Sequence, residues 1–168
     1  MPIRTAEAKD LDALVNIYAI ARRYMVESGN PNQWADGRPT RGELAASVEQ
    51  GSVCVGVDEA DVPHFAFTVY TTPDPTYAVI DDGSWLSDDP YVTIHRVASD
   101  GTMHGVFAQA VAYAKDVAAE VGYHDIRVDT HHDNKTMQHV IAKAGFSRRG
   151  IIYLEDGDPR IAYELVLA

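Results

Sequence analysis

The stretch that decides the fold begins with Tyr91-Val92-Thr93-Ile94-His95-Arg96-Val97 and runs to Phe146. Its β-branched and aromatic residues predict a strand over Tyr91–Val97. A loop with two glycines follows at Asp100–Gly105. Apolar residues then recur three and four positions apart, which predicts a helix over Val106–Val121 with one buried stripe. Gly122 should end that helix, because glycine tolerates a positive φ.

A second strand and a second helix are predicted after Gly122. The strand covers His124–Thr130, and the helix covers Asn134–Ala144 with Asp133 as a candidate cap and Gly145 as its stop. Successive residues of the strand point to opposite faces. One face carries Ile126, Val128 and Thr130, and the other carries Arg127, Asp129 and His131.

The loop before the first helix is a candidate phosphate site. The first backbone N–H groups of a helix have no partner within the helix, and the positive end of the helix dipole attracts anions there. Gly105 would let a ligand approach the backbone closely. The alternative is an ordinary turn between a strand and a helix.

Several motifs are similar to those of the GNAT acetyltransferase superfamily. Thr102-Met103-His104-Gly105-Val106-Phe107 takes the place of that family's phosphate loop, Arg/Gln-x-x-Gly-x-Gly/Ala, and Gly105 is the residue that matches. The family's later motif, Asn-x-x-Ala-x-x-Leu-Tyr-x-Lys-x-Gly-Phe, aligns in register with Asn134, Met137, Val140, Ile141, Lys143, Gly145 and Phe146. One branch of the family also resembles the chain at Asp129-Thr130-His131 and Asp156-Gly157-Asp158-Pro159-Arg160. The resemblance covers essentially the whole chain.

The resemblance implies an α/β fold with a splayed, mixed β-sheet and helices on both faces, in a single N-acetyltransferase-like domain over residues 1–168. It implies direct transfer of an acetyl group from the co-substrate acetyl-CoA to a primary amine. The backbone at Val97-Ala98-Ser99 would pair with the pantetheine arm, and N–H groups of the phosphate loop would hold the pyrophosphate. Asn134 would bind the pantetheine amide or thioester region, with a helix cap as its alternative role. The implied cofactor-binding residues are Val97, Ala98, Ser99, Thr102, Met103, His104, Gly105, Val106, Phe107, Asn134 and Met137.

The acid and base that this reaction needs are not at the family's usual positions. The tyrosine acid of the family falls at Ile141, and no carboxylate lies between Tyr91 and Val97, where many members carry a glutamate. The candidate substitutes are Tyr153, His95, Asp129 and His131. Each has a structural alternative: an aromatic residue on a strand, a core histidine, or a partner for a nearby arginine.

Composition narrows the class of protein. The chain has 168 residues with a formal net charge of −11, which makes nucleic acid an unexpected partner because such affinity depends on clustered Lys and Arg. An acidic surface favours cationic small molecules or basic peptides, with plain solubility as the alternative. The single cysteine, Cys54, excludes an internal disulfide and suits a reducing cytosol. No apolar run reaches bilayer length and no leader pattern opens the chain, so we expect a cytoplasmic protein.

No metal site is expected. The sequence lacks a Cys pair and a His-Glu-x-x-His motif, and the adjacent His131 and His132 should point to opposite faces of a strand. A homodimer through the last strands is left open. A second function from a different class is a non-catalytic CoA-binding or regulatory module, because the phosphate loop departs from the family pattern.

The rest of the chain predicts further elements of one domain. A short strand at Ile3-Arg4-Thr5 precedes a helix that Asp10 can cap, and Thr40 with Glu43 forms a capping box for a second helix. An antiparallel hairpin is predicted over Ser52–Val57 and His64–Thr72, and a final hairpin over Phe146–Leu154 and Arg160–Val166. Trp34 is interpreted as an anchor on the core, or alternatively as part of a substrate wall. Pro73–Asp89, with its apolar run Tyr77–Ile80, is a strand extension or a substrate-side loop.

Overall fold

The computed structural model describes residues 2–168, and in that range seven strands form one mixed sheet in the order β1-β2-β3-β4-β5-β7-β6. This confirms the predicted α/β class. Two compact units make up the chain: one contains the residues up to Val69 together with Arg96–Val106, and the other contains Tyr70–His95 together with Phe107–Ala168. A single domain over residues 1–168 stays a prediction, and its first residue lies outside the described residues.

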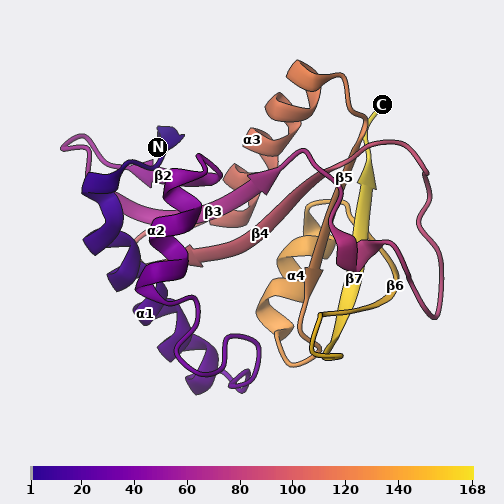
Figure 1. Cartoon of the computed structure of the whole chain (residues 1–168), viewed down its shortest axis with the longest axis horizontal. Helices are drawn as coiled ribbons and strands as arrows, with labels where there is room; N and C mark the ends of the chain where they lie inside the picture. Colours follow the sequence, from indigo (N-terminus) through magenta and orange to yellow (C-terminus); the bar gives the residue numbers. More distant parts are fainter. Residues whose placement is uncertain (1) are drawn as a thin grey trace. The chain divides into compact units, whose positions relative to one another are not determined.

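The first unit is a small layered structure of helices on strands (Figure 1). Its elements are β1 (Ile3–Thr5), a 3-10 helix (Ala8–Asp10), α1 (Leu11–Glu27), α2 (Arg41–Glu49), β2 (Val53–Val57) and β3 (Pro63–Tyr70). β2 pairs antiparallel with both β1 and β3, which confirms the predicted hairpin. The core of this unit combines α1 and α2 with the buried faces of the strands, including Leu14, Ile17, Tyr18, Leu44, Val53, Val55 and Val57. Cys54 is buried.

The second unit holds the rest of the sheet. Its elements are a 3-10 helix (Pro75–Tyr77), the beginning of β4 (Val92–Ser99), α3 (Val106–Val121) from Phe107 on, β5 (Asp125–Thr130), α4 (Lys135–Lys143), β6 (Ser147–Tyr153) and β7 (Pro159–Val166). β5 and β6 each pair antiparallel with β7, which confirms the final hairpin. The predicted helix over Val106–Val121 has the bounds of α3. Phe107 of α3 packs against Phe146, and the centroids of these two buried rings are 6.0 Å apart.

Caps and short segments differ from expectation in three places. The cap of α4 is Asn134, whose side chain accepts a hydrogen bond from the N–H of Met137 at 3.0 Å, so Asp133 was the wrong residue. Asp10 precedes α1 but makes no side-chain cap bond, since its carboxylate binds Arg4 at 2.7 Å. Tyr77–Ile80 is not a strand, because Tyr77 ends a 3-10 helix that begins at Pro75. The capping box of Thr40 and Glu43 is confirmed.

Arg96 of β4 has an unusual backbone conformation and is the residue at which the first unit resumes in the sequence. The φ of Arg96 is 53°, a left-handed conformation that non-glycine residues adopt only when their surroundings hold it. In the first unit, the Tyr18 hydroxyl donates to the Arg96 carbonyl at 2.6 Å, and Arg96 Nη2 lies 3.6 Å from Glu43 Oε2. Contacts from α1 and α2 therefore hold Arg96 in this conformation.

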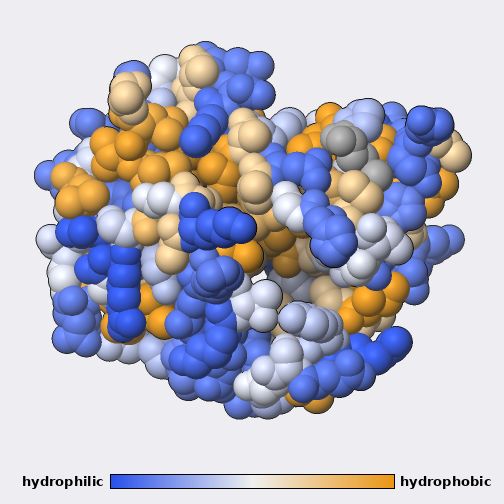
Figure 2. Space-filling view, turned by 180° about the vertical axis from the view of Figure 1, so that it is seen from behind, coloured by the Kyte–Doolittle hydropathy of each residue, from blue (hydrophilic) through white to orange (hydrophobic). Residues whose placement is uncertain are grey.

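The surface carries the acidic charge of the sequence. Figure 2 shows hydrophilic residues over much of one face, with hydrophobic residues between them. Among residues 2–168, no helix has the length and apolar character that crossing a membrane requires.

Candidate active site

Strands β4 and β5 pair only where they begin. Their parallel ladder joins Val92 to Ile126 and Thr93 to Arg127. β5 then continues alongside β7 as far as Thr130, so within the second unit the other edge of β5 has no ladder partner beyond Arg127. The free backbone groups of such an edge can bind an extended ligand.

Four side chains meet where the two strands part, and we call Asp74, Tyr77, His95 and Asp129 the His95 cluster. Nε2 of His95 lies 3.1 Å from Oδ2 of Asp74, and Nδ1 lies 3.7 Å from Oδ1 of Asp129. The Tyr77 hydroxyl donates to the same Oδ1 at 2.6 Å. The side chain of His95 keeps an exposed fraction of 24%, so a small molecule can reach the ring.

The local sequence holds Asp74 in place before any substrate binds. Asp74 caps the 3-10 helix that starts at Pro75, and its Oδ1 accepts hydrogen bonds from the N–H and the hydroxyl of Thr76 at 2.9 and 2.7 Å. The N–H of Asp74 donates to the Tyr91 hydroxyl at 2.9 Å. These contacts leave Oδ2 directed at His95.

The surroundings of the His95 cluster lower the pKa of Asp74 and raise the pKa of Tyr77. Burial by itself would raise the pKa of Asp74, but hydrogen bonds from His95 and Thr76 outweigh burial and lower it to about 2. Burial, and next the charge of Asp129, raises the pKa of Tyr77 well above its usual range. The Tyr77 hydroxyl therefore stays protonated and donates a hydrogen bond to Asp129. Asp74 stays ionised and presents a negative charge to His95.

This arrangement suits a group that takes up and releases a proton. An imidazole whose two nitrogens each face a carboxylate is held in one orientation, and either nitrogen can carry the proton. Histidine is the side chain most often used as a general base or acid near neutral pH.

A second cluster, formed by Asp125, Arg127 and Glu164, fastens the loop that follows the 3-10 helix. Arg127 Nε lies 3.1 Å from Glu164 Oε2, and its Nη2 lies 3.4 Å from Asp125 Oδ2. The guanidinium carbon lies 4.1 Å from the ring centroids of both Trp85 and Tyr91. We call Asp125, Arg127 and Glu164 the Arg127 cluster.

The backbone of the loop is held by the same cluster. Arg127 donates to the carbonyl of Ser87, and the N–H of Leu86 donates to Glu164. Trp85 also donates to the carbonyl of Tyr77 at 2.9 Å. The stretch predicted as a strand extension or substrate-side loop is therefore a loop packed on β5 and β7, next to the His95 cluster.

In the first unit, the start of the phosphate loop is ordered by Asp100. Its Oδ1 accepts hydrogen bonds from the N–H and the hydroxyl of Thr102 at 3.0 and 2.6 Å. Gly105 has a φ of 68°, and a Cβ placed there would have no atom within 4 Å. The loop thus keeps open space at Gly105, although the N–H of Thr102 already has a partner.

The structure matches solved structures over nearly the whole chain. An acetyltransferase of the GNAT family from Streptococcus agalactiae 2603 is 28% identical, with a TM-score of 0.81, over 99% of this chain and 95% of that one. A GNAT-family acetyltransferase from Listeria monocytogenes 4b F2365 is 22% identical, with a TM-score of 0.72, over 99% of this chain and 94% of that one. This chain has the GNAT acetyltransferase fold. The predicted resemblance is thereby confirmed.

A third GNAT structure was solved with its co-substrate. The phosphinothricin acetyltransferase from Sinorhizobium meliloti, in complex with AcCoA, is 14% identical with a TM-score of 0.66, over 99% of this chain and 88% of that one. At that identity the likeness concerns the fold alone. No protein-family sequence model and no curated protein sequence matches this chain.

Within the GNAT fold, the four catalytic candidates separate into one pair and two single residues. His95 and Asp129 come together in the His95 cluster. Tyr153 lies on β6 with 42% of its surface exposed, and slight burial followed by the charge of Asp81 raises its pKa. His131 is buried after β5, and burial followed by the charge of Arg160 lowers its pKa. A catalytic role for any of the four stays a prediction.

His131 and His132 face the same way, which corrects the prediction that they point to opposite faces. β5 ends at Thr130, so the alternation of a strand no longer applies, and the two imidazole rings stack with centroids 4.2 Å apart. Ligand atoms of His131, His132 and Asp133 lie within 4.8 Å of one another. Nδ1 of His131 already accepts a hydrogen bond from the N–H of Asp133 at 3.0 Å.

The predicted cofactor residues lie on both units. Val97, Ala98 and Ser99 form the end of β4, and Ala98 is buried in the core of the first unit. The remaining residues of the set are Thr102, Met103, His104, Gly105 and Val106 in the first unit, and Phe107, Asn134 and Met137 in the second. Asn134 has the helix-capping role that was its alternative, and a contact with CoA is an additional prediction.

Sequence reasoning missed Asp74 and Tyr77 as members of the site. Both lie in the stretch predicted as a substrate-side loop, about 20 residues before His95 in the sequence. The available signal was Asp-Pro-Thr-Tyr at Asp74–Tyr77, because an Asp before a Pro is typical of a capped short helix. That signal predicts a turn, but it does not predict which histidine the carboxylate reaches.

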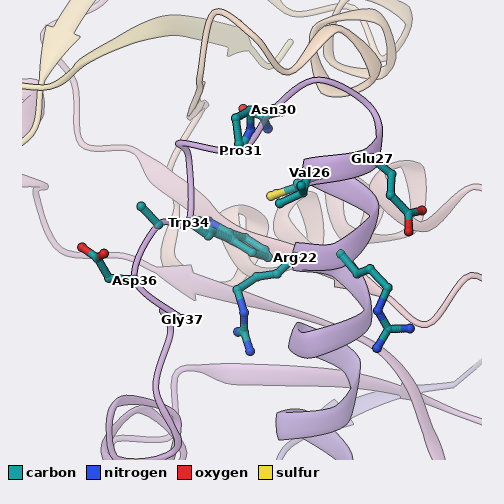
Figure 3. Close-up of a pocket in the computed structure, with 11 residues that line it drawn as sticks. Arg22, Val26, Glu27, Asn30, Pro31, Trp34, Asp36 and Gly37 are labelled. Carbon is teal, nitrogen blue, oxygen red and sulfur yellow. The ribbon is translucent and has the colours of Figure 1, made fainter.

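A pocket of about 450 Å³ lies in the first unit, between the second half of α1 and residues 30–37. Figure 3 shows Trp34 from this loop facing the same space as Arg22 and Val26 from α1. Trp34 also packs on the core, with its ring centroid 5.4 Å from that of Tyr18, which confirms its role as an anchor. Its alternative role as part of a ligand wall is compatible with the same position.

Proposed function

We propose that the protein is an acetyl-CoA-dependent N-acetyltransferase that acetylates a primary amine by direct transfer. The observation that carries the proposal is the His95 cluster, a reachable imidazole between two carboxylates at the point where β4 and β5 part, in a chain with the GNAT fold. An acetyltransferase with bound AcCoA among the structural neighbours supports the choice of co-substrate.

The roles of the residues follow from the chemistry. The neutral amine attacks the thioester carbonyl, a C–N bond forms and the C–S bond breaks. His95 accepts the proton that leaves the nitrogen and returns it to the departing thiolate, so the products are an amide and free CoA. Asp74 and Asp129 orient the ring and stabilise its protonated form during the transfer, and Tyr77 orients Asp129.

Acetyl-CoA would be bound mainly through backbone groups. The open space at Gly105 and the start of α3 suit a pyrophosphate, because N–H groups at a helix start bind anions. The backbone of Val97, Ala98 and Ser99 would pair with the pantetheine arm. The acceptor is expected to be a cationic amine in its resting form, since a net charge of −11 attracts cations over long range.

The test measures CoA-thiol release with a panel of amines: free amino acids including phosphinothricin, polyamines, aminoglycosides and peptides with a free α-amine. With an accepted amine, His95→Gln should lower kcat by about 10²–10⁴ and leave the Kd for acetyl-CoA within about twofold. His139→Gln on the exposed side of α4 is the matched control and should keep full activity. Wild-type turnover by His95→Gln would remove His95 from the mechanism.

The alternative is a CoA-binding module without catalysis. It is favoured by the buried apolar Ile141 at the position of the family's acid and by the engaged N–H of Thr102. Tight binding of acetyl-CoA without thiol release for any amine would support this alternative.

A further inference from the structure

His64 links the phosphate loop to the turn between β2 and β3. It lies near the beginning of β3 and within the first unit, as do both of its partners. Nδ1 of His64 lies 2.7 Å from Oδ2 of Asp100, and Nε2 lies 2.8 Å from Oδ2 of Asp58. The carbonyl of His64 also accepts the N–H of Asp100 at 3.0 Å. Both the side chain and the backbone of His64 therefore hold Asp100.

Each end of this link is itself rigid. At the turn, Oδ1 of Asp58 accepts the N–H groups of Ala60 and Val62 at 2.8 and 3.0 Å. At the loop, the other oxygen of Asp100 binds Thr102 through two hydrogen bonds. The connection thus runs from a closed turn through one imidazole to the first residues of the phosphate loop.

The geometry is satisfied only by the protonated ring. A neutral imidazole has one N–H, so one of the two short N–O contacts would then bring a lone pair against a carboxylate. The groups that face the ring are the carboxylates of Asp58 and Asp100 and the hydroxyl of Thr102, whose oxygen is 3.3 Å from Nδ1. Hydrogen bonds to Asp58 and then Asp100 accordingly raise the pKa of His64.

We propose that His64 is a positioning residue for the phosphate loop, and that its imidazolium keeps residues 99–105 in the conformation that receives the pyrophosphate of CoA. It also neutralises Asp100, whose negative charge would otherwise repel the ligand's phosphates. The identity of the ligand rests on the proposed function, whereas the ordering of the loop does not. His64 touches neither substrate nor reacting atoms in this scheme, so it acts through the loop alone.

The sign of the pH effect follows from the raised pKa. The imidazolium is present below the ordinary value of 6.5 and is lost as the pH rises through the raised value. Ordering of the loop and affinity for acetyl-CoA should therefore decrease together as the pH rises from 6.5 through that raised value.

The experiment compares wild type with His64→Asn, whose amide can still donate to Asp100 but carries no charge and does not reach Asp58. His139→Gln, at an exposed position of α4, is the matched control. The first readout is hydrogen–deuterium exchange of residues 99–105 in the ligand-free protein. The second is calorimetric titration at pH 6 and pH 8.5 with acetyl-CoA and with S-acetyl-pantetheine, which lacks the pyrophosphate.

We expect His64→Asn to exchange the loop amides about tenfold faster and to bind acetyl-CoA about tenfold more weakly at pH 6. Its affinity for S-acetyl-pantetheine should equal that of wild type, and its acetyl-CoA affinity should change less between the two pH values than that of wild type. Loop exchange equal to wild type would overturn the inference. If wild type binds no acetyl-CoA, the proposed function fails, and the exchange of the ligand-free loop still decides whether His64 orders it.

Discussion

Replacement of Arg127 by methionine should destabilise the protein more than any surface substitution of the same kind. The guanidinium is the counter-charge for Glu164, whose side chain is 0% exposed, and its Nη2 also lies 3.4 Å from Asp125, which is 1% exposed. Removing one partner of a buried ion pair costs about 3–5 kcal/mol, because it leaves an uncompensated charge. Loss of the contacts with the two flanking aromatic rings adds to this cost, and methionine recovers part of the apolar packing.

Two features limit the expected loss. Asp125 already carries a proton at pH 7, since burial and then the neighbouring Glu164 carboxylate raise its pKa to about 8, so only Glu164 loses its counter-charge. The loop that holds Leu86 and Ser87 can also open locally, which would let water reach Glu164. We therefore expect a decrease in the free energy of unfolding of about 3–5 kcal/mol, or roughly 10 °C in Tm for a chain of this size.

The assay is urea unfolding at pH 7, followed by far-ultraviolet circular dichroism and by tryptophan fluorescence. Arg148→Met on the exposed side of β6 is the control and should change stability by about 0.5 kcal/mol or less. Arg127→Met combined with Glu164→Gln should recover part of the loss, because the unpaired charge is then gone. A loss below about 1 kcal/mol for Arg127→Met alone would refute the reasoning that the cluster depends on its cation.

Three further predictions concern stability. Asp125→Asn should reduce a pH dependence. The folded carboxyl keeps its proton up to a pKa of about 8, whereas the unfolded one releases it near 3.8, so the wild type should lose stability as the pH rises from 5 to 8. The variant should lose less stability over the same range, measured by urea unfolding at both pH values. In thermal melts, Gly56→Ala should lower the free energy of unfolding by about 1–3 kcal/mol, because its Cβ would lie 2.1 Å from the Phe65 ring and overpack the core. Gly42→Ala in α2 should be neutral or slightly stabilising in the same melts. Asn134→Ala should lower the free energy of unfolding by about 1 kcal/mol, because the cap of α4 is lost. Calorimetric titration with acetyl-CoA would show separately whether Asn134 also binds the co-substrate. An unchanged Kd would mean that capping the helix is its whole role.

Local patterns were sufficient to predict most helices and strands and the resemblance to the GNAT fold. The apolar spacing of Val106–Val121 and the capping box of Thr40 are local interactions, decided within one or two helical turns, and both are present as predicted. The final hairpin followed from the turn residues between two β-rich segments. The motif around Asn134 pointed to the GNAT fold even though the phosphate loop departs from the family pattern.

Tertiary structure decided which polar residues share a site. Asp74 and His95 are 21 positions apart, and Tyr77 and Asp129 are 52 apart, so no periodicity relates the members of the His95 cluster. Their contact depends on β4 and β5 running parallel for two residues and then parting, and on a short 3-10 helix before β4 that places Asp74 and Tyr77 against both strands. The sequence could not separate His131 and Tyr153 from His95 as catalytic candidates, because residue type alone carries no information on distance.

The sequence by itself determined the elements, the family resemblance and the acidic character of this protein, because each of these depends on neighbours along the chain or on composition. Only the tertiary structure joined His95 to its two carboxylates, Arg127 to Glu164, and His64 to Asp58 and Asp100. Hydrogen bonds and ion pairs act over about 3–4 Å, and that proximity between distant segments arises only when the strands have paired and their loops have packed.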